Sequence, residues 1–258
     1  MAYENKVKKK LAAGGTAWGA GTVIASELAA KWAAGTGVDF IWIDTEHMHF
    51  ATESIHMMPI MVRASGAMPM VRVSNLDPGL IKKALDIGAS AVMIPQVDNA
   101  QQAELVVKYA KYPPQGNRGI SPMWSFYMDI SWEDYLPHAN DETMVVVQVE
   151  TKEALSKVEE IAAVEGVDVV LAGPMDLSAA HDHIGQISHP SVQKFLEEFP
   201  ARVTKQGKTA GIALGSYESA VIAWKRGFRF INFANILHDG VRGIKADLAR
   251  LRELTGEV

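Results

Sequence analysis

Short apolar segments rich in β-branched residues recur along the chain, and stretches of helical pattern separate them. Eight such segments predict β-strands, at 16–21, 40–46, 68–74, 91–97, 144–150, 167–173, 209–214 and 228–235. Several of them, such as 144–150 and 167–173, carry apolar residues on both faces, which is typical of parallel strands that are buried on both sides. The pattern therefore predicts a parallel sheet covered by helices.

Amphipathic stretches between these strands predict helices, and the clearest are 81–89, 99–112 and 151–164. Asn99 is well suited to cap the second of them, and Thr151 stands where the third is expected to begin. Eight strand–helix units of about 30 residues fit a closed barrel better than an open sheet. We therefore predict an α/β fold, a (β/α)8 TIM barrel, with residues 1–258 forming a single catalytic domain.

One connection is longer than the others. Residues 113–143 separate the fourth and fifth strands and contain four prolines, Pro113, Pro114, Pro122 and Pro137. Long loops in compact domains are usually functional, often as lids. This segment is a candidate lid.

Composition narrows the function classes. The chain is 48% hydrophobic and 21% charged, and its net charge of −5 disfavours a nucleic-acid partner. It has no cysteine, so disulfides and thiolate chemistry are excluded. The first residues lack the apolar core of a signal peptide, and no segment reaches the length of a membrane span. We expect a cytoplasmic enzyme with no membrane partner.

Polar residues gather where the predicted strands end, and in a barrel these ends meet at one face. They are Asp44, Glu46, His47, Arg72, Ser74, Gln148, Glu150 and Asp176, with Gly173, Pro174 and Met175 before the last. The sequence thus predicts an active site at this face.

Gln148 and Glu150 are two residues apart and point to the same face of their strand. Asp176 lies one strand–helix unit later, so it is expected at the end of the neighbouring strand. Two carboxylates in this arrangement suit a hard divalent cation such as Mg²⁺ or Mn²⁺. Alternatively, each acid caps the helix that follows it. We favour the metal because the two acids occur together.

Arg72 ends an apolar strand and needs an anionic partner there, either a substrate carboxylate or enolate, or a neighbouring acid such as Asp44. His47 is a candidate for proton transfer, because the imidazole side chain is suited to exchange protons near neutral pH. On spacing alone, a hydrogen-bonded loop histidine is the favoured interpretation of His47.

Three motifs suggest other chemistry. The pairs HMH at 47–49 and HDH at 181–183 resemble zinc ligands, but no third ligand stands at the usual spacing, which favours loop histidines. GAGTVI at 19–24 resembles a dinucleotide fingerprint. Ile24 occupies the place of its third glycine, which disfavours an oxidoreductase.

Five segments together resemble the HpcH/HpaI aldolase family, which comprises class II, metal-dependent pyruvate aldolases. They are IDTEH at 43–47, VRVS at 71–74, KYPPQGNRGI at 111–120, QVET at 148–151 and VEGVDVVLAGPMDLS at 164–178. The resemblance covers nearly the whole chain.

The resemblance implies roles for these residues. Glu150 and Asp176 would hold the metal, and Arg72 would bind the keto oxygen of pyruvate and its enolate. His47 would be the base, oriented by Asp86, and Asp44 would lie beside the aldehyde. Gln148, Gly173, Pro174, Met175 and Trp42 would line the substrate site, with backbone amides of 173–176 taking the carboxylate.

The function that follows is the cleavage of a 4-hydroxy-2-oxo acid to pyruvate, or a close 2-oxo acid, and an aldehyde, and the reverse addition. A divalent metal (Mg²⁺, Mn²⁺ or Co²⁺) would stabilise the enolate. Oxaloacetate decarboxylation or cleavage of an acyl-CoA would use the same enolate. The family also implies a homohexamer in which the C-terminal helix is exchanged between subunits.

Overall fold

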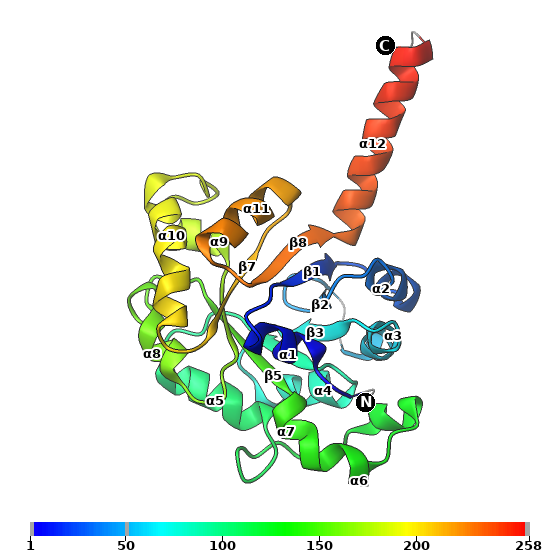
Figure 1. Ribbon diagram of the computed structural model, residues 1–258, viewed down its shortest axis with the longest axis vertical. Helices are drawn as coiled ribbons and strands as arrows, with labels where there is room; N and C mark the ends of the chain where they lie inside the picture. The colour runs from blue at the N-terminus through cyan, green and yellow to red at the C-terminus, as the bar shows by residue number, and fades with distance from the viewer. Residues whose placement is uncertain (1–2, 50–51, 256–258) are drawn as a thin grey trace.

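Eight parallel strands close into one barrel in chain order, each pairing with its sequence neighbours and β8 pairing with β1 (Figure 1). The computed structural model describes residues 3–49 and 52–255. The strands are β1 (Ala17–Thr22), β2 (Phe40–Asp44), β3 (Met68–Arg72), β4 (Ala91–Ile94), β5 (Met144–Val149), β6 (Val169–Ala172), β7 (Thr209–Ala213) and β8 (Phe230–Asn235). The predicted (β/α)8 barrel is confirmed.

Helices surround this barrel (Figure 1). Apart from those in the long connection before β5, the helices between strands are α2 (Glu27–Ala34), η1 (Thr52–Ser54), α3 (Met58–Ala64), α4 (Pro78–Asp86), α5 (Ala100–Ala110), η4 (Ala154–Ser156), α8 (Val158–Ala163), α9 (Pro174–Ala180), α10 (Pro190–Thr204) and α11 (Tyr217–Arg226). α1 (Lys6–Ala12) precedes the first strand, and Val7 on it joins the apolar cluster inside the barrel.

The predicted helices are found with one exception. Asn99 caps α5, and its side chain accepts a hydrogen bond from the Gln102 amide at 3.0 Å. The helix predicted over 151–164 is wrong, because the chain forms two short elements, η4 and α8, on either side of Lys157. Thr151 instead lies in the loop before η4, where its hydroxyl accepts from the Ala154 amide at 3.2 Å and donates to Asp98.

The glycine motif does not form a dinucleotide turn. Gly19 and Gly21 lie within β1, paired with Phe40 and Trp42 of β2, and α2 begins only at Glu27. A dinucleotide site requires a glycine-rich turn that leads directly into a helix, and these glycines do not form one. The oxidoreductase alternative is not supported.

The long connection lies away from the predicted site. It contains η2 (Met123–Met128), α6 (Trp132–Tyr135), η3 (Leu136–His138) and α7 (Ala139–Glu142). It leads into the first residue of β5, so it lies at the amino-terminal end of the barrel, next to the chain's N-terminus (Figure 1). Tyr3 packs against Tyr135 and His138 there. The interpretation as a lid over the site of its own chain is wrong.

Strand geometry carries the site residues to one place. Alternate residues of a strand point to the same face, and Phe40 and Trp42 of β2 belong to the cluster inside the barrel. Asp44 continues this inward series at the end of the strand. Met68 and Met70 of β3 lead in the same way to Arg72, and the register sets Arg72 beside Asp44. An apolar interior thus ends in a polar layer at the carboxyl ends of the strands.

The last helix stands apart from the barrel. α12 (Ile236–Thr255) projects from the end of β8, and none of its residues is buried (Figure 1). Within the described part of the chain, no helix is both long and apolar enough to cross a membrane. The assignment of all 258 residues to a single domain stays a prediction.

Candidate active site

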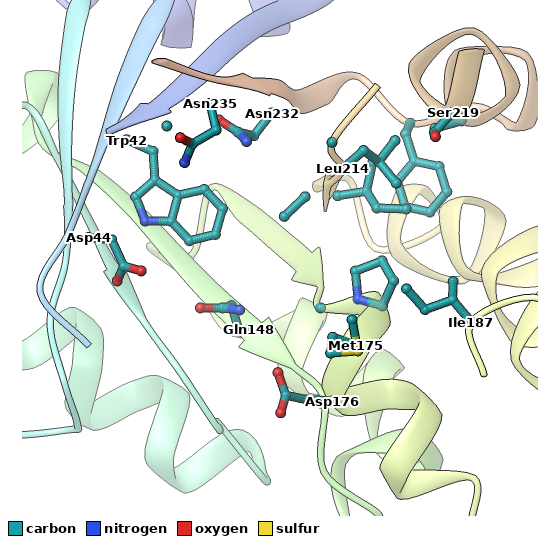
Figure 2. Close-up of a pocket in the computed structure, with 18 of the residues that line it drawn as sticks. Trp42, Asp44, Gln148, Met175, Asp176, Ile187, Leu214, Ser219, Asn232 and Asn235 are labelled. Atoms are coloured by element: carbon teal, nitrogen blue, oxygen red, sulfur yellow. The ribbon is translucent and has the colours of Figure 1, made fainter. Parts of the chain in front are cut away.

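A cavity of about 750 Å³ opens at the carboxyl ends of the strands (Figure 2). Most of the residues predicted to form the site line it, namely Trp42, Asp44, His47, Arg72, Gln148, Gly173, Pro174, Met175 and Asp176. Barrel enzymes place their active sites at this face. The cavity is therefore the candidate active site.

Arg72 is the centre of the polar layer. Its guanidinium donates two hydrogen bonds to Asp44, from Nε to Oδ1 at 2.9 Å and from Nη2 to Oδ2 at 2.6 Å. Nη1 lies 2.8 Å from Oε2 of Glu46, and the ring of Trp42 lies against the guanidinium, 4.6 Å away. Both the arginine and Asp44 are buried. Arg72 is thus held rigidly by two acids and an aromatic ring.

A second chain of hydrogen bonds leads from Arg72 to Glu150. Gln148 accepts from Nη1 of Arg72 at 3.4 Å and donates to Oε2 of Glu150 at 2.8 Å. The backbone amide of Gln96 donates to Oε1 of Glu150 at 3.0 Å. Gln96 adopts a left-handed conformation with φ of 51°, which few residues other than glycine accept. Local backbone strain thus accompanies the placement of this carboxylate.

Gly173 leaves room for Glu150. A Cβ atom on this glycine would lie 2.3 Å from Oε2 of Glu150, so any larger residue would displace the carboxylate. Gly173 also precedes α9, which starts with Pro174 and has no side-chain cap. Asp176 lies in the first turn of α9 rather than at the end of β6. It is exposed and faces the cavity below Met175 (Figure 2).

Burial and, to a smaller extent, the negative charge of Asp176 together raise the pKa of Glu150 to about 7. Burial likewise raises the pKa of Glu46, against the opposing effect of Arg72. The polar layer holds four carboxylates, those of Asp44, Glu46, Glu150 and Asp176, against the single guanidinium of Arg72. Ionised, the cluster carries a charge of −3, so it favours a cation and repels a free anion.

The donor set of this cluster consists of carboxylate oxygens. Over residues 3–49 and 52–255, no three His, Asp or Glu side chains are grouped so as to hold a metal ion. Glu150 and Asp176 can therefore supply only two protein ligands, as Mg²⁺ sites often do.

His47 lies at the cavity, but Asp86 does not. The His47 side chain is 59% exposed, and its Nε2 lies 3.8 Å from Glu46. Asp86 is the last residue of α4, and barrel helices run antiparallel to the strands, so it lies at the opposite end of the barrel. There it accepts from Arg118 at 2.6 Å. Asp86 therefore does not orient His47 of the same chain, and the prediction is wrong for this pair.

Two polar residues of the site had no predicted role. Glu46 was noted at its strand end, but nothing in the sequence indicated that it would pair with Arg72. Asn232 on β8 is buried and lines the cavity, and its Oδ1 has no hydrogen-bond partner. Asn232 stands two residues after Phe230, which points inward, so the two-residue period of the strand could have identified it.

An eight-stranded barrel with acids and an arginine at the carboxyl ends of its strands has the architecture of a barrel enzyme. The chain belongs to the HpcH/HpaI aldolase/citrate lyase family, whose model matches residues 23–230. The resemblance seen in the sequence is thereby confirmed.

Individual relatives agree with this assignment. A hydroxypyruvate/pyruvate aldolase from Roseobacter denitrificans is 35% identical, over 89% of this chain and 90% of that protein. A 4-hydroxy-2-oxo-heptane-1,7-dioate aldolase from Escherichia coli is 36% identical, over 84% and 83% respectively. The crystal structure of a family member from Burkholderia cenocepacia is 31% identical, with a TM-score of 0.89 over 96% of this chain and 99% of that one.

Because the pKa of Glu150 is raised, we expect this side chain to lower the free energy of unfolding of the metal-free protein in a pH-dependent way. An acid whose pKa is higher in the folded state than its ordinary value of 4.5 destabilises the fold as pH rises from 4.5 to about 7. We expect Glu150→Gln to stabilise the EDTA-treated protein by up to about 3 kcal/mol at pH 8 and by little at pH 4.5.

Urea unfolding of both proteins across this pH range, in EDTA, measures the difference. Asp134→Asn, which removes an exposed carboxylate far from the cavity, is the matched control. If Glu150→Gln changed the free energy of unfolding by the same amount at every pH, a buried charge on Glu150 could not be its cause.

Proposed function

We propose that this protein is a divalent-metal-dependent aldolase that cleaves a 4-hydroxy-2-oxo acid to pyruvate, or a close 2-oxo acid, and an aldehyde, and catalyses the reverse addition. The observation that carries the proposal is the cluster of four carboxylates around Arg72. A 2-oxo acid is an anion, and this cluster would repel it unless a cation were also present.

The residues of the cluster fit a divalent metal. Glu150 and Asp176 offer hard oxygen ligands, and the free energy cost of burying Glu150 in its ionised form would fall if a cation were bound. Mg²⁺, Mn²⁺ or Co²⁺ would suit these ligands. When bound, the ion supplies a Lewis acid that stabilises the negative charge of the enolate.

The protein's own groups bind and orient the substrate. Arg72 directs its guanidinium toward the cavity, while Asp44 and Glu46 fix its position, so it can donate to the keto oxygen as negative charge develops there. The uncapped start of α9 provides the backbone N–H groups of Met175 and Asp176 for the substrate carboxylate. Gln148 holds the carboxylate of Glu150 in place.

Proton transfer falls to His47. It lines the cavity, it is solvent-accessible, and its Nε2 faces Glu46 rather than an apolar wall. A histidine in this position can remove the proton from the 4-hydroxyl of the substrate when the carbon–carbon bond breaks, and return it in the reverse addition. Asp44 and Trp42 then line the side of the cavity that receives the aldehyde.

The alternatives use the same chemistry. Oxaloacetate decarboxylation would pass through the same enolate, and the site could catalyse it as a side reaction. An acyl-CoA substrate is less well matched, because Arg72 and Arg226 are the only lysines or arginines among the described residues that line the cavity. The cytoplasmic location expected from the sequence stays a prediction.

The proposal predicts an absolute requirement for a divalent metal. EDTA-treated protein should not release pyruvate from oxaloacetate or exchange the methyl protons of pyruvate in D₂O, and both activities should return with Mg²⁺, Mn²⁺ or Co²⁺. Glu150→Ala and Asp176→Ala should each reduce metal-restored activity at least a thousandfold, because either removes half of the protein ligands. Asp182→Ala, at an exposed acid outside the cavity, is the control.

Proton NMR and a coupled pyruvate assay provide the measurements. Full activity in EDTA, or in either ligand variant, would refute the metal assignment.

We also propose that the protein is a homo-oligomer, a hexamer by family resemblance, in which α12 packs against a second copy. One face of α12 carries exposed apolar residues at helical spacing, namely Leu237, Val241, Ile244, Leu248, Leu251 and Leu254. An isolated helix with such a face is not expected to be stable in water. Trp32 on α2 is 74% exposed and is one of several uncovered apolar side chains on the barrel.

Charging this face of α12 should break the assembly. We expect Ile244→Asp to lower the mass measured by light scattering to that of a smaller species. Ala246→Asp places the same charge on the opposite face of α12 and should leave the mass unchanged. Equal masses for both variants and the unmodified protein would contradict the role of this face.

A further inference from the structure

The carboxylate of Glu150 is fixed on three sides by groups of the protein itself. The backbone N–H of Gln96 donates to Oε1 at 3.0 Å, and the side-chain amide of Gln148 donates to Oε2 at 2.8 Å. On the third side, Gly173 lies so close that a Cβ atom on it would be 2.3 Å from Oε2. A carboxylate oxygen has two acceptor positions, so each of these oxygens retains one for a cation.

The contact from Gln96 comes from outside the strand that carries Glu150. β4 ends at Ile94, and the chain then passes beside the end of β5 through Gln96 and Val97. The N–H of Gln96 donates to Oε1 of Glu150, and the N–H of Val97 donates to the backbone oxygen of Gln148 at 3.0 Å. Two successive N–H groups therefore both point toward β5.

A regular strand does not present its N–H groups in this way. Successive N–H groups of an extended chain point in opposite directions, one toward each neighbouring strand. The left-handed conformation of Gln96, with φ of 51°, turns both N–H groups to the same side, as in the backbone turns that bind anions. The conformation of this one residue therefore decides whether the Glu150 carboxylate receives a backbone donor.

The side chain of Gln96 does not account for its conformation. Glycine enters the left-handed region freely and asparagine enters it often, whereas glutamine does so rarely. The Gln96 side chain is exposed, so packing around it does not hold the residue there. The backbone contacts to β5 impose the conformation instead, and strained residues of this kind gather at functional sites.

We propose that Gln96 is a positioning residue for metal binding, whose left-handed backbone holds the Glu150 carboxylate in the orientation that a divalent cation needs. This inference rests on the proposed function, in which Glu150 is a metal ligand. A group that orients a metal ligand typically contributes roughly ten- to a hundredfold to the metal affinity. The role belongs to the peptide group of residue 96 and not to its side chain.

Three substitutions at position 96 separate the backbone from the side chain. Gln96→Val removes the side-chain amide and resists the left-handed conformation, because its Cβ is branched. Gln96→Gly removes the same amide but adopts this conformation freely, and Gln96→Asn retains an amide and accepts the conformation.

Calorimetry measures Mn²⁺ binding to each protein after metal has been stripped with EDTA and the EDTA removed. We expect the Mn²⁺ affinity to fall roughly ten- to a hundredfold in Gln96→Val. Gln96→Gly and Gln96→Asn should restore it to within about threefold of the unmodified protein, because both allow the left-handed turn.

Asp129 provides a control of matched strain. It is also a left-handed residue other than glycine, with φ of 53°, but it follows η2 in the long connection at the amino-terminal end of the barrel. Asp129→Val should lower the midpoint of thermal unfolding, as Gln96→Val does, and leave the Mn²⁺ affinity within about threefold. A loss of affinity in Gln96→Val alone is then separate from a general loss of stability.

Hydrogen exchange in the metal-free protein reports the backbone contact directly. Mass spectrometry of the segment around Gln96 and Val97 should show slow exchange in the unmodified protein and in Gln96→Gly. Exchange should be at least about tenfold faster in Gln96→Val, because the two N–H groups lose their partners.

Two results would overturn the proposal. Equal losses of Mn²⁺ affinity in Gln96→Gly and Gln96→Val would assign the effect to the side chain. Unchanged affinity in Gln96→Val, with faster exchange, would show that Glu150 binds the ion equally well without the backbone donor. Should Gln96→Val fail to fold, Gln96→Thr, which is branched at the same carbon but polar, replaces it with the same expected loss. Absence of Mn²⁺ binding to the unmodified protein would instead refute the proposed function.

Discussion

The site depends on holding an arginine and several acids together in a space with little water. Asp44 and Glu46 both contact the guanidinium of Arg72, and Gln148 connects it to Glu150. Each contact would be weak if exposed, but burial strengthens it because the surrounding medium screens charge poorly. The acids outnumber the arginine, so the cluster remains negative. This excess charge makes a divalent cation the natural complement of the site.

The barrel tolerates this cluster because its lower layers are rigid and apolar. Phe40 and Phe230 stack with ring centroids 4.1 Å apart, and Gly19 leaves the space for them. Above this packed layer, the parallel strands fix Asp44 and Arg72 in register. The left-handed Gln96 and the buried Glu150 beside Gly173 both lie at the carboxyl ends of the strands. Backbone strain and a buried carboxylate thus occur where binding can offset them.

Much of this arrangement could be predicted from the sequence. The two-residue period of a strand decides which side chains enter the barrel, so Trp42, Asp44, Arg72 and Gln148 could be assigned to one site before the fold was known. The regular alternation of strands and helices in turn predicted a closed barrel. Both signals are local and periodic, which is why they can be read from one chain.

The features that sequence missed depend on contacts between distant parts of the chain. Glu46 lies beyond the end of its strand, where periodicity no longer applies, and its pairing with Arg72 depends on how the loop folds. Asp86 was linked to His47 through the family, but the direction of α4 carries it to the other end of the barrel.

One binding measurement tests the central claim that the carboxylate cluster accepts a 2-oxo acid only together with a divalent cation. Oxalate has the planar, dianionic form of the pyruvate enolate, and calorimetry can measure its binding to EDTA-treated protein with and without Mn²⁺. We expect no detectable oxalate binding without the metal and tight binding with it. Oxalate that binds equally well in EDTA would contradict the requirement for a cation, because Arg72 alone would then suffice to hold the anion.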